Sequence, residues 1–292
     1  MANTNINPFG QGGELPAGYP ISTSLDENNA QKAAAASTVY QLKRMIGSAG
    51  GHWNGKKWYG FGTSITNTSS EGKYATYLAA LSGMTFVNCG HSGGGITAGS
   101  NHSVYDDVMS RNLADADLIT LEVGANEGVS PLGSIYDGLP DETVLNGRNH
   151  DDVVNYTGVT DNSTFCGALN LILRHLLATT NAQIVVFQSP NARYLTYTSG
   201  ASAGQTKYYD GNEKSTSGYT NVECQKAIED ICKLNSVHFV PSYNGLGYAR
   251  LNASNAFNVD NIHQSNLGGY NFAQAIWSQL KNIPLFYTAV PT

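Results

Sequence analysis

Three polar residues that lie far apart in the sequence are of the types needed for acyl transfer. Ser64 follows a short apolar segment and a glycine, so it stands where a strand gives way to a turn. Asp260 and His263 are three positions apart, which lets the carboxylate hold one imidazole nitrogen while the other faces outward. We therefore predict that Ser64 is a nucleophile, that His263 is its general base and that Asp260 orients His263.

Two further residues could stabilise the oxyanion of such a reaction. Gly93 lies in a glycine-rich segment after a predicted strand, where a missing side chain lets backbone N–H groups approach a ligand closely. Asn126 follows the next predicted strand and can donate a side-chain N–H into the same space. Together with the N–H of Ser64, these groups would form an oxyanion hole in which each donor contributes about 3 kcal/mol.

A parallel sheet with helices between its strands would bring these residues together. Short apolar segments alternate along the chain with amphipathic ones, a pattern typical of such a sheet. Strands are predicted over residues 57–61, 84–88, 117–123, 183–188 and 237–240. Helices are predicted over residues 71–81, 104–114, 164–179, 222–234 and 267–280. Chemistry collects at the carboxyl ends of parallel strands, so the candidate residues are expected at one edge of the sheet.

The first of these helices carries its own start and stop signals. Ser69 or Ser70 can cap its beginning with a side-chain oxygen, and Gly83 is expected to end it. The helix over residues 164–179 has the clearest 3.6-residue period. Its apolar positions should face the core: Phe165, Ala168, Leu169, Ile172 and Leu176.

The chain resembles the SGNH (GDSL) hydrolase superfamily, whose four named residue types stand here in order on the predicted turns: Ser64, Gly93, Asn126 and His263. The segment Asn88-x-Gly90-x-x-Gly93 resembles the second block of that family, and Asp260-x-x-His263 its last. The resemblance covers residues 57 to 282. It implies a flavodoxin-like three-layer α/β/α sandwich, a five-stranded parallel sheet in the order 2-1-3-4-5, no metal or other cofactor, and hydrolysis of carboxylic esters.

Two departures from the family pattern bear on the site. The usual Gly-Asp-Ser is Gly62-Thr63-Ser64 here, and the family's aspartate generally supports the turn, so Thr63 puts those hydrogen bonds in doubt. The usual Gly-x-Asn-Asp is Gly124-Ala125-Asn126-Glu127, a mild change beside an intact Asn126.

A second serine has to be weighed as the nucleophile. The segment Gly90-His91-Ser92-Gly93-Gly94 matches the Gly-x-Ser-x-Gly elbow of α/β-hydrolases. However, three consecutive glycines follow Ser92 with no immediate helix, and α/β-hydrolases usually carry their acid and histidine on separate loops. We therefore prefer Ser64.

Two long polar segments, residues 127–163 and 189–221, follow predicted strands and should lie at the same edge of the sheet as the site. The second is rich in tyrosines that could stack on sugars, among them Tyr194, Tyr197, Tyr208 and Tyr209. A surface loop packed on itself is the alternative. His91, beside the predicted site, is a further candidate for contact with substrate.

We expect an N-terminal arm over residues 1–50 and a hydrolase domain over residues 51–292. Proline and glycine in residues 1–21 favour an extended arm, and the alanine-rich residues 29–46 favour a short helix. Apolar residues at heptad spacing in this helix indicate a homo-oligomer, although a helix packed on its own domain is the alternative. Residues 15–42 resemble connectors of phage tail-fibre and receptor-binding proteins, which often form trimers.

Composition narrows the partners and the location. A net charge of −6 argues against nucleic acid as a partner, and no apolar run reaches the roughly 18 residues of a membrane span. Residues 1–20 lack a signal-peptide pattern. The tail resemblance favours an extracellular or virion location, with a cytoplasmic one as the alternative. The four cysteines form no CxxC pair, so neither metal nor redox use is expected.

These observations predict a serine esterase whose substrate is an acylated glycan or a small ester. We expect it to remove O-acetyl or similar small acyl groups from a cell-surface glycan, as part of a phage tail. A lipase or general esterase is the alternative enzyme, placed second because the polar segments lack a long apolar stretch to hold an acyl chain. A non-catalytic glycan-binding module on the same fold is the alternative outside enzymes.

Overall fold

The computed structural model describes residues 51–67, 73–97, 102–124, 126–127, 130–139, 160–190, 194–196, 206–208, 218–242 and 263–285. The chain divides into two units, Met1–Met45 and Ile46–Thr292. The first unit lies outside the described residues, and so do the predicted arm and the helix over residues 29–46. The domain boundary and the oligomer therefore stay predictions, and the second unit is described below.

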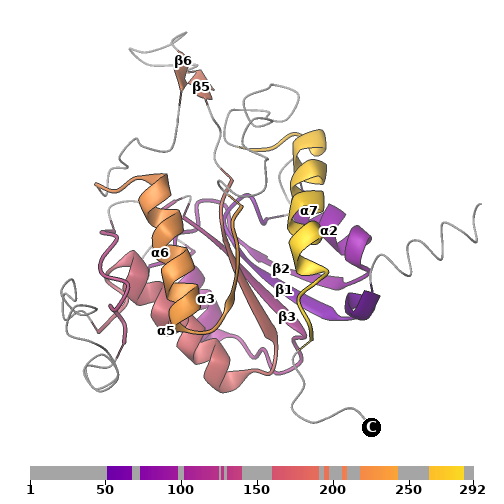
Figure 1. Ribbon diagram of the computed structural model, residues 1–292, viewed down its shortest axis with the longest axis horizontal. Helices are drawn as coiled ribbons and strands as arrows, with labels where there is room; N and C mark the ends of the chain where they lie inside the picture. Colours follow the sequence, from indigo (N-terminus) through magenta and orange to yellow (C-terminus); the bar gives the residue numbers. More distant parts are fainter. Residues whose placement is uncertain are drawn as a thin grey trace, which may run out of the picture. The chain divides into compact units, whose positions relative to one another are not determined.

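Five parallel strands form the centre of the second unit (Figure 1). They are β1 (Lys57–Gly62), β2 (Thr85–Gly90), β3 (Leu118–Val123), β4 (Gln183–Gln188) and β7 (His238–Val240). Their order across the sheet is β2-β1-β3-β4-β7, and every neighbouring pair is parallel. The predicted order 2-1-3-4-5 is thus confirmed, with β7 as the fifth strand of the sheet.

Helices cover both faces of the sheet, which confirms the three-layer α/β/α sandwich (Figure 1). They are α2 (Tyr74–Ser82), α3 (Val104–Ser110), α5 (Phe165–Thr179), α6 (Asn221–Leu234) and α7 (Asn266–Leu280). Side chains of α3, α5 and α6 share one hydrophobic cluster with the sheet, and those of α2 and α7 share another. Each large apolar side chain buried in this way contributes about 1.5–3 kcal/mol to stability.

The strands are buried on both faces, as a covered parallel sheet requires. In β4, Ile184 and Val186 pack into the cluster with α5, while Val185 and Phe187 pack into the cluster with α7. The predicted apolar face of α5 is confirmed, because all five of its named positions are buried.

Two predicted helix boundaries were wrong. Helix α2 begins at Tyr74, and its N-cap is Lys73 without a side-chain cap bond, so neither Ser69 nor Ser70 is the cap. Its predicted end is confirmed, since Gly83 takes the left-handed conformation (φ 72°) that glycine adopts readily. Helix α3 ends at Ser110 and not at residue 114, because Arg111 already has an extended backbone.

A small antiparallel hairpin in the second polar segment was not predicted. Strand β5 (Tyr194–Thr196) pairs with β6 (Thr206–Tyr208), and Tyr194 lies opposite Tyr208 in the register. Strands of three residues are too short to show a clear two-residue alternation in the sequence. A short 3-10 helix, η1 (Gly51–Trp53), precedes β1 and was also missed, because three residues are too few to show a helical period.

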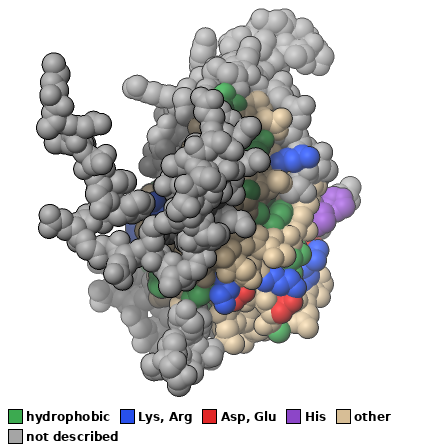
Figure 2. Space-filling view, turned by 90° about the vertical axis from the view of Figure 1, so that its right-hand side faces the viewer, with side chains coloured by type: hydrophobic (Ala, Val, Ile, Leu, Met, Phe, Trp, Pro, Cys, Tyr) green, Lys and Arg blue, Asp and Glu red, His purple; other side chains and the backbone are tan. Residues whose placement is uncertain are grey.

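The described surface carries few charged side chains. On the face shown in Figure 2, several Lys and Arg side chains lie beside Asp or Glu side chains. Lys56 and Asp117, which directly precede β1 and β3, form an ion pair of 3.1 Å. Among the described helices, none is long and apolar enough to cross a membrane.

Candidate active site

Ser64 and His263 lie side by side at the carboxyl edge of the sheet. Ser64 lies two residues after the end of β1, and His263 lies two residues before Ser265, the N-cap of α7. Nε2 of His263 is 2.8 Å from Oγ of Ser64, a hydrogen-bond distance, and both residues are partly buried. Asp260, the predicted orienting residue, lies outside the described residues.

Gly62 allows the turn before Ser64 to pass close to β3. A side-chain carbon at Gly62 would lie 2.5 Å from Oε2 of Glu122 and 2.6 Å from Oγ1 of Thr66. Thr63, which stands where the resembled family has aspartate, donates its backbone N–H to Oε2 of Glu122 at 2.8 Å. The hydrogen bonds that the sequence left in doubt are therefore made to a carboxylate from the neighbouring strand.

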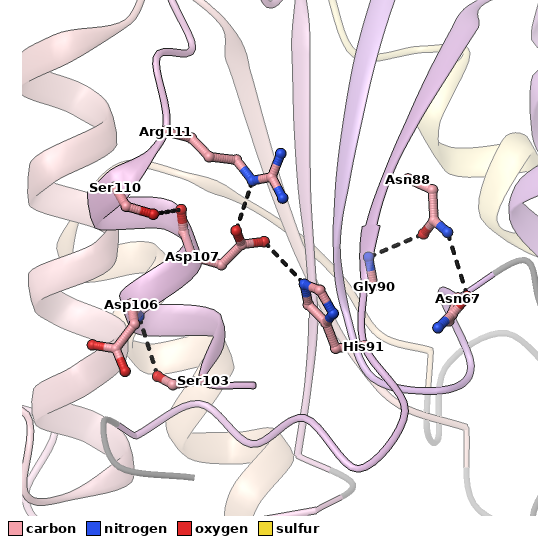
Figure 3. Close-up of polar contacts among 9 residues, drawn as sticks. All are labelled: Asn67, Asn88, Gly90, His91, Ser103, Asp106, Asp107, Ser110 and Arg111. Atoms are coloured by element: carbon pink, nitrogen blue, oxygen red, sulfur yellow. Dashed lines mark hydrogen bonds and ion pairs between the residues drawn. The ribbon is translucent and has the colours of Figure 1, made fainter. Parts of the chain in front are cut away.

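The loop after β2 packs directly on the turn that carries Ser64. His91 donates its backbone N–H to the carbonyl oxygen of Gly62 at 2.9 Å. At Gly90, an added side-chain carbon would lie 2.6 Å from the backbone nitrogen of Asn67, so only glycine fits. The side chain of Asn88 joins the two loops, because it accepts from the N–H of Gly90 at 3.0 Å and donates to Asn67 at 3.4 Å (Figure 3).

The two predicted oxyanion residues lie on adjoining loops. Gly93 has a left-handed backbone (φ 76°) and is exposed at the surface. Asn126 is exposed as well, and its Nδ2 donates to the carbonyl oxygen of Gly94 at 3.3 Å. The structure therefore brings the loop of Asn126 to the loop of Gly93, and an oxyanion role for both stays a prediction.

A buried carboxylate fastens these two loops together. Glu127 accepts the N–H of Gly124 on one oxygen and the N–H of Ile96 on the other, each at 2.8 Å. Burial raises the pKa of Glu127 to about 7, although the two backbone hydrogen bonds act against the rise. Glu127, which stands where the resembled family has aspartate, is thus a hydrogen-bonded acid.

His91 contacts helix α3 through its side chain. Its Nε2 lies 3.5 Å from Oδ2 of Asp107, whose other oxygen accepts from Nε of Arg111 at 2.7 Å (Figure 3). The ring also stacks on that of His102, with centroids 5.0 Å apart and planes 9° apart. A role for His91 in substrate binding stays a prediction.

Ser92, the alternative nucleophile, is exposed in the loop after β2. Residues 92–97 contain no helix, and α3 begins only at Val104, so the strand–turn–helix context of a nucleophile elbow is absent from these residues. The imidazole of His263 forms its hydrogen bond with the other candidate, Ser64.

The predicted tyrosines are described only in part. Tyr194 and Tyr208 face each other as backbone partners in the hairpin, while Tyr197 and Tyr209 lie outside the described residues. A contact between these tyrosines and substrate therefore stays a prediction.

Sequence reasoning gave no role to Glu122. A signal was present, since a glutamate near the end of the otherwise apolar segment Leu118–Val123 is rarely buried without partners. Within the described part of the chain, no group of three or more His, Cys, Asp or Glu side chains could hold a metal ion.

Several solved structures are similar to this chain, and those with a TM-score above 0.5 share its fold. A structural-genomics protein from Lactobacillus plantarum is 22% identical, with 80% of this chain and 100% of that chain covered and a TM-score of 0.59. A possible lipase from Chitinophaga pinensis is 20% identical over 77% of this chain and 98% of its own, with a TM-score of 0.53. An acetyl xylan esterase from Geobacillus stearothermophilus is 15% identical over 80% of this chain and 98% of its own, with a TM-score of 0.47. No protein-family model and no curated protein matches the sequence.

Proposed function

We propose that the chain is a serine esterase that hydrolyses carboxylic esters, with Ser64 as nucleophile and His263 as general base. The observation that carries the proposal is the 2.8 Å contact between Oγ of Ser64 and Nε2 of His263. A serine hydroxyl is a weak nucleophile until an adjacent base accepts its proton, and the imidazole lies where it can do so. Asp260, three residues before His263, is the proposed orienting acid.

The reaction follows from these positions. Oγ of Ser64 attacks the ester carbonyl carbon while its proton passes to Nε2 of His263. The tetrahedral oxyanion is stabilised by the backbone N–H groups of Ser64 and Gly93 and by the side chain of Asn126. His263 then protonates the departing alcohol oxygen, which leaves the acyl group on Ser64. A water molecule then gives a proton to His263 and attacks this acyl-enzyme. His263 returns the proton to Oγ of Ser64 as the bond from Ser64 to the acyl carbon breaks and the carboxylic acid is released.

The polar segment that follows β4 bears on the nature of the substrate. This segment, residues 189–221, contains the β5–β6 hairpin with Tyr194 and Tyr208. Tyrosines in a segment rich in serine, glycine and asparagine can stack on sugar rings. This supports a glycan whose small acyl groups, such as O-acetyl, are the substrate. The resemblance of residues 15–42 to phage tail connectors supports an extracellular or virion role, in an oligomer formed through residues 29–46.

A lipase or general esterase is the second candidate. It is favoured by one structural neighbour that is described as a possible lipase, and such an enzyme needs an apolar surface for a longer acyl chain. The two candidates differ in the acyl length that they prefer.

Hydrolysis of p-nitrophenyl acetate and p-nitrophenyl octanoate tests both candidates at once. We expect faster turnover of the acetate by the wild type, loss of turnover in Ser64→Ala, and retention in the matched variant Ser92→Ala. Faster octanoate turnover would favour the lipase, and loss of activity only in Ser92→Ala would refute the proposed nucleophile. A folded wild type that hydrolyses neither ester, nor an acetylated polysaccharide, would favour the non-catalytic binding module.

A further inference from the structure

A fully buried carboxylate lies beneath the turn that carries Ser64. Glu122 is the second-last residue of the central strand β3, and none of its surface is exposed. Removing a carboxylate from water costs several kcal/mol unless hydrogen bonds replace the lost hydration. A leucine or valine would fill the same place without that cost, so the contacts of Glu122 have to explain its presence.

Four donors from the turn and from the end of β4 converge on this carboxylate. Thr63 donates its N–H at 2.8 Å and its hydroxyl at 2.9 Å to Oε2 of Glu122. The hydroxyl of Thr66 donates to the same oxygen at 3.0 Å. The hydroxyl of Ser189, one residue after β4, donates to Oε1. These donors favour the ionised form of Glu122, which only accepts hydrogen bonds, and act against the rise that burial causes in its pKa.

The same network reaches the core on the far side of the turn. The hydroxyl of Tyr74 lies 2.9 Å from that of Thr66, and its ring packs edge-on against Phe187 and Phe272. Within the turn, Ile65 donates its N–H to the hydroxyl of Thr63 at 3.2 Å. The backbone on both sides of Ser64 is therefore fastened to one carboxylate and, through it, to β3 and β4.

We propose that Glu122 is the positioning residue of the nucleophile turn, which it holds so that Oγ of Ser64 faces His263. The proposal rests on the proposed function, in which Ser64 attacks the substrate. The close passage of the turn over Glu122, which only a glycine at position 62 permits, indicates that the turn is built around this acid. A nucleophile displaced by about 1 Å can lose roughly 100-fold in rate, so the position of the turn should be visible in turnover.

The central test is Glu122→Gln, which keeps the shape of the side chain. Its amide has one accepting oxygen and one donating nitrogen, so a donor would face the N–H of Thr63 or the hydroxyl of Ser189. Thr120→Val is the matched control, because Thr120 is buried two positions earlier on β3 and accepts from the indole of Trp58 at 2.8 Å, away from the turn. Both variants lose buried hydrogen bonds, but only Glu122→Gln changes a side chain that contacts the turn.

We expect Glu122→Gln to lower kcat on p-nitrophenyl acetate by at least about 30-fold, because a displaced nucleophile reacts more slowly. KM should change less than about 3-fold. The rate at which a fluorophosphonate labels Ser64 should fall in parallel. Thr120→Val should lose melting temperature yet keep kcat within about 2-fold. A merely structural role for Glu122 would lower the melting temperature of both variants and leave kcat of the folded protein unchanged, which would overturn the proposal.

A second pair of variants covers the case in which Glu122→Gln does not fold. Thr63→Val removes the hydroxyl that donates to Glu122 at nearly constant volume, and Thr63→Ser keeps it. We expect Thr63→Val to lower kcat at least about 5-fold more than Thr63→Ser, because only Thr63→Val frees the turn from this hydrogen bond to Glu122. Equal kcat values would overturn the proposal. Failure of the proposed function is distinguishable, because activity would then be absent from the wild type or present in Ser64→Ala.

Discussion

Nε2 of His263 lies 2.8 Å from Oγ of Ser64, although 199 positions of sequence separate the two residues. A helix follows each of them: α2 begins at Tyr74, ten positions after Ser64, and α7 begins at Asn266, three positions after His263. These helices pack against each other through aromatic rings, with Tyr77 and Tyr270 edge-to-face at 5.6 Å between centroids. The distance between the two reactive atoms is thus set by helix packing as well as by the sheet.

Removing the imidazole of His263 should abolish most of the activity. A general base accelerates such a reaction by about 100-fold to 10,000-fold, so His263→Ala should lower kcat by that order. The matched control is His238→Ala, since His238 is exposed at the start of β7, at the opposite edge of the sheet. Steady-state hydrolysis of p-nitrophenyl acetate checks both variants. Equal losses in the two variants would contradict the assignment.

Gly90, the last residue of β2, and Gly93, in the loop that follows, should respond differently to alanine. At Gly90 the added carbon would lie 2.6 Å from the backbone of Asn67, so Gly90→Ala must displace the turn after Ser64. We expect it to cost about 1–3 kcal/mol in stability and to lower kcat. At Gly93 nothing lies within 4 Å of the added carbon, so Gly93→Ala has only the cost of its left-handed backbone, about 1 kcal/mol.

Urea unfolding and turnover measured on both glycine variants check this contrast. Gly93→Ala retains its backbone N–H, so the proposed oxyanion donor is preserved. A larger loss of stability and kcat in Gly93→Ala than in Gly90→Ala would show that the loop does not pack as described.

Stability should depend on pH through Glu127. Burial raises its pKa from 4.5 to about 7, so between these values the native protein binds a proton that the unfolded chain releases. The free energy of unfolding should therefore fall as the pH rises from about 5 to 7.5, by roughly 1–3 kcal/mol from this group. Glu127→Gln, which cannot ionise, should show a smaller fall, as measured by denaturant unfolding across this range. Parallel curves for the two proteins would contradict this account of Glu127.

A parallel sheet could be predicted because the chain alternates short apolar segments with amphipathic ones. The order of its strands was implied by the resemblance to the SGNH hydrolases, and that order is the observed one. The predicted ends of helices were less accurate where backbone geometry decides them. Helix α3, for example, ends at Ser110 because Arg111 has an extended backbone. The β5–β6 hairpin was missed because three-residue strands carry almost no periodic signal.

The candidate site was predictable to the extent that its residues carry local signals. Ser64 follows a strand and a glycine, and His263 precedes a helix, so both positions could be proposed from sequence. The roles of Glu122 and Glu127 depend on which backbone N–H groups lie opposite each carboxylate, and those partners come from other segments. No local pattern specifies such pairings, because they follow from the packing of the loops.

Covalent trapping tests the central claim most directly. A fluorophosphonate reacts with an activated serine and leaves a stable adduct, which peptide mass spectrometry locates on one residue. We predict a single adduct on the peptide that contains Ser64, formed slowly or not at all in His263→Ala. An adduct on Ser92, or labelling of Ser64 that is equally fast without His263, would contradict the assignment of Ser64 and His263 as the catalytic pair.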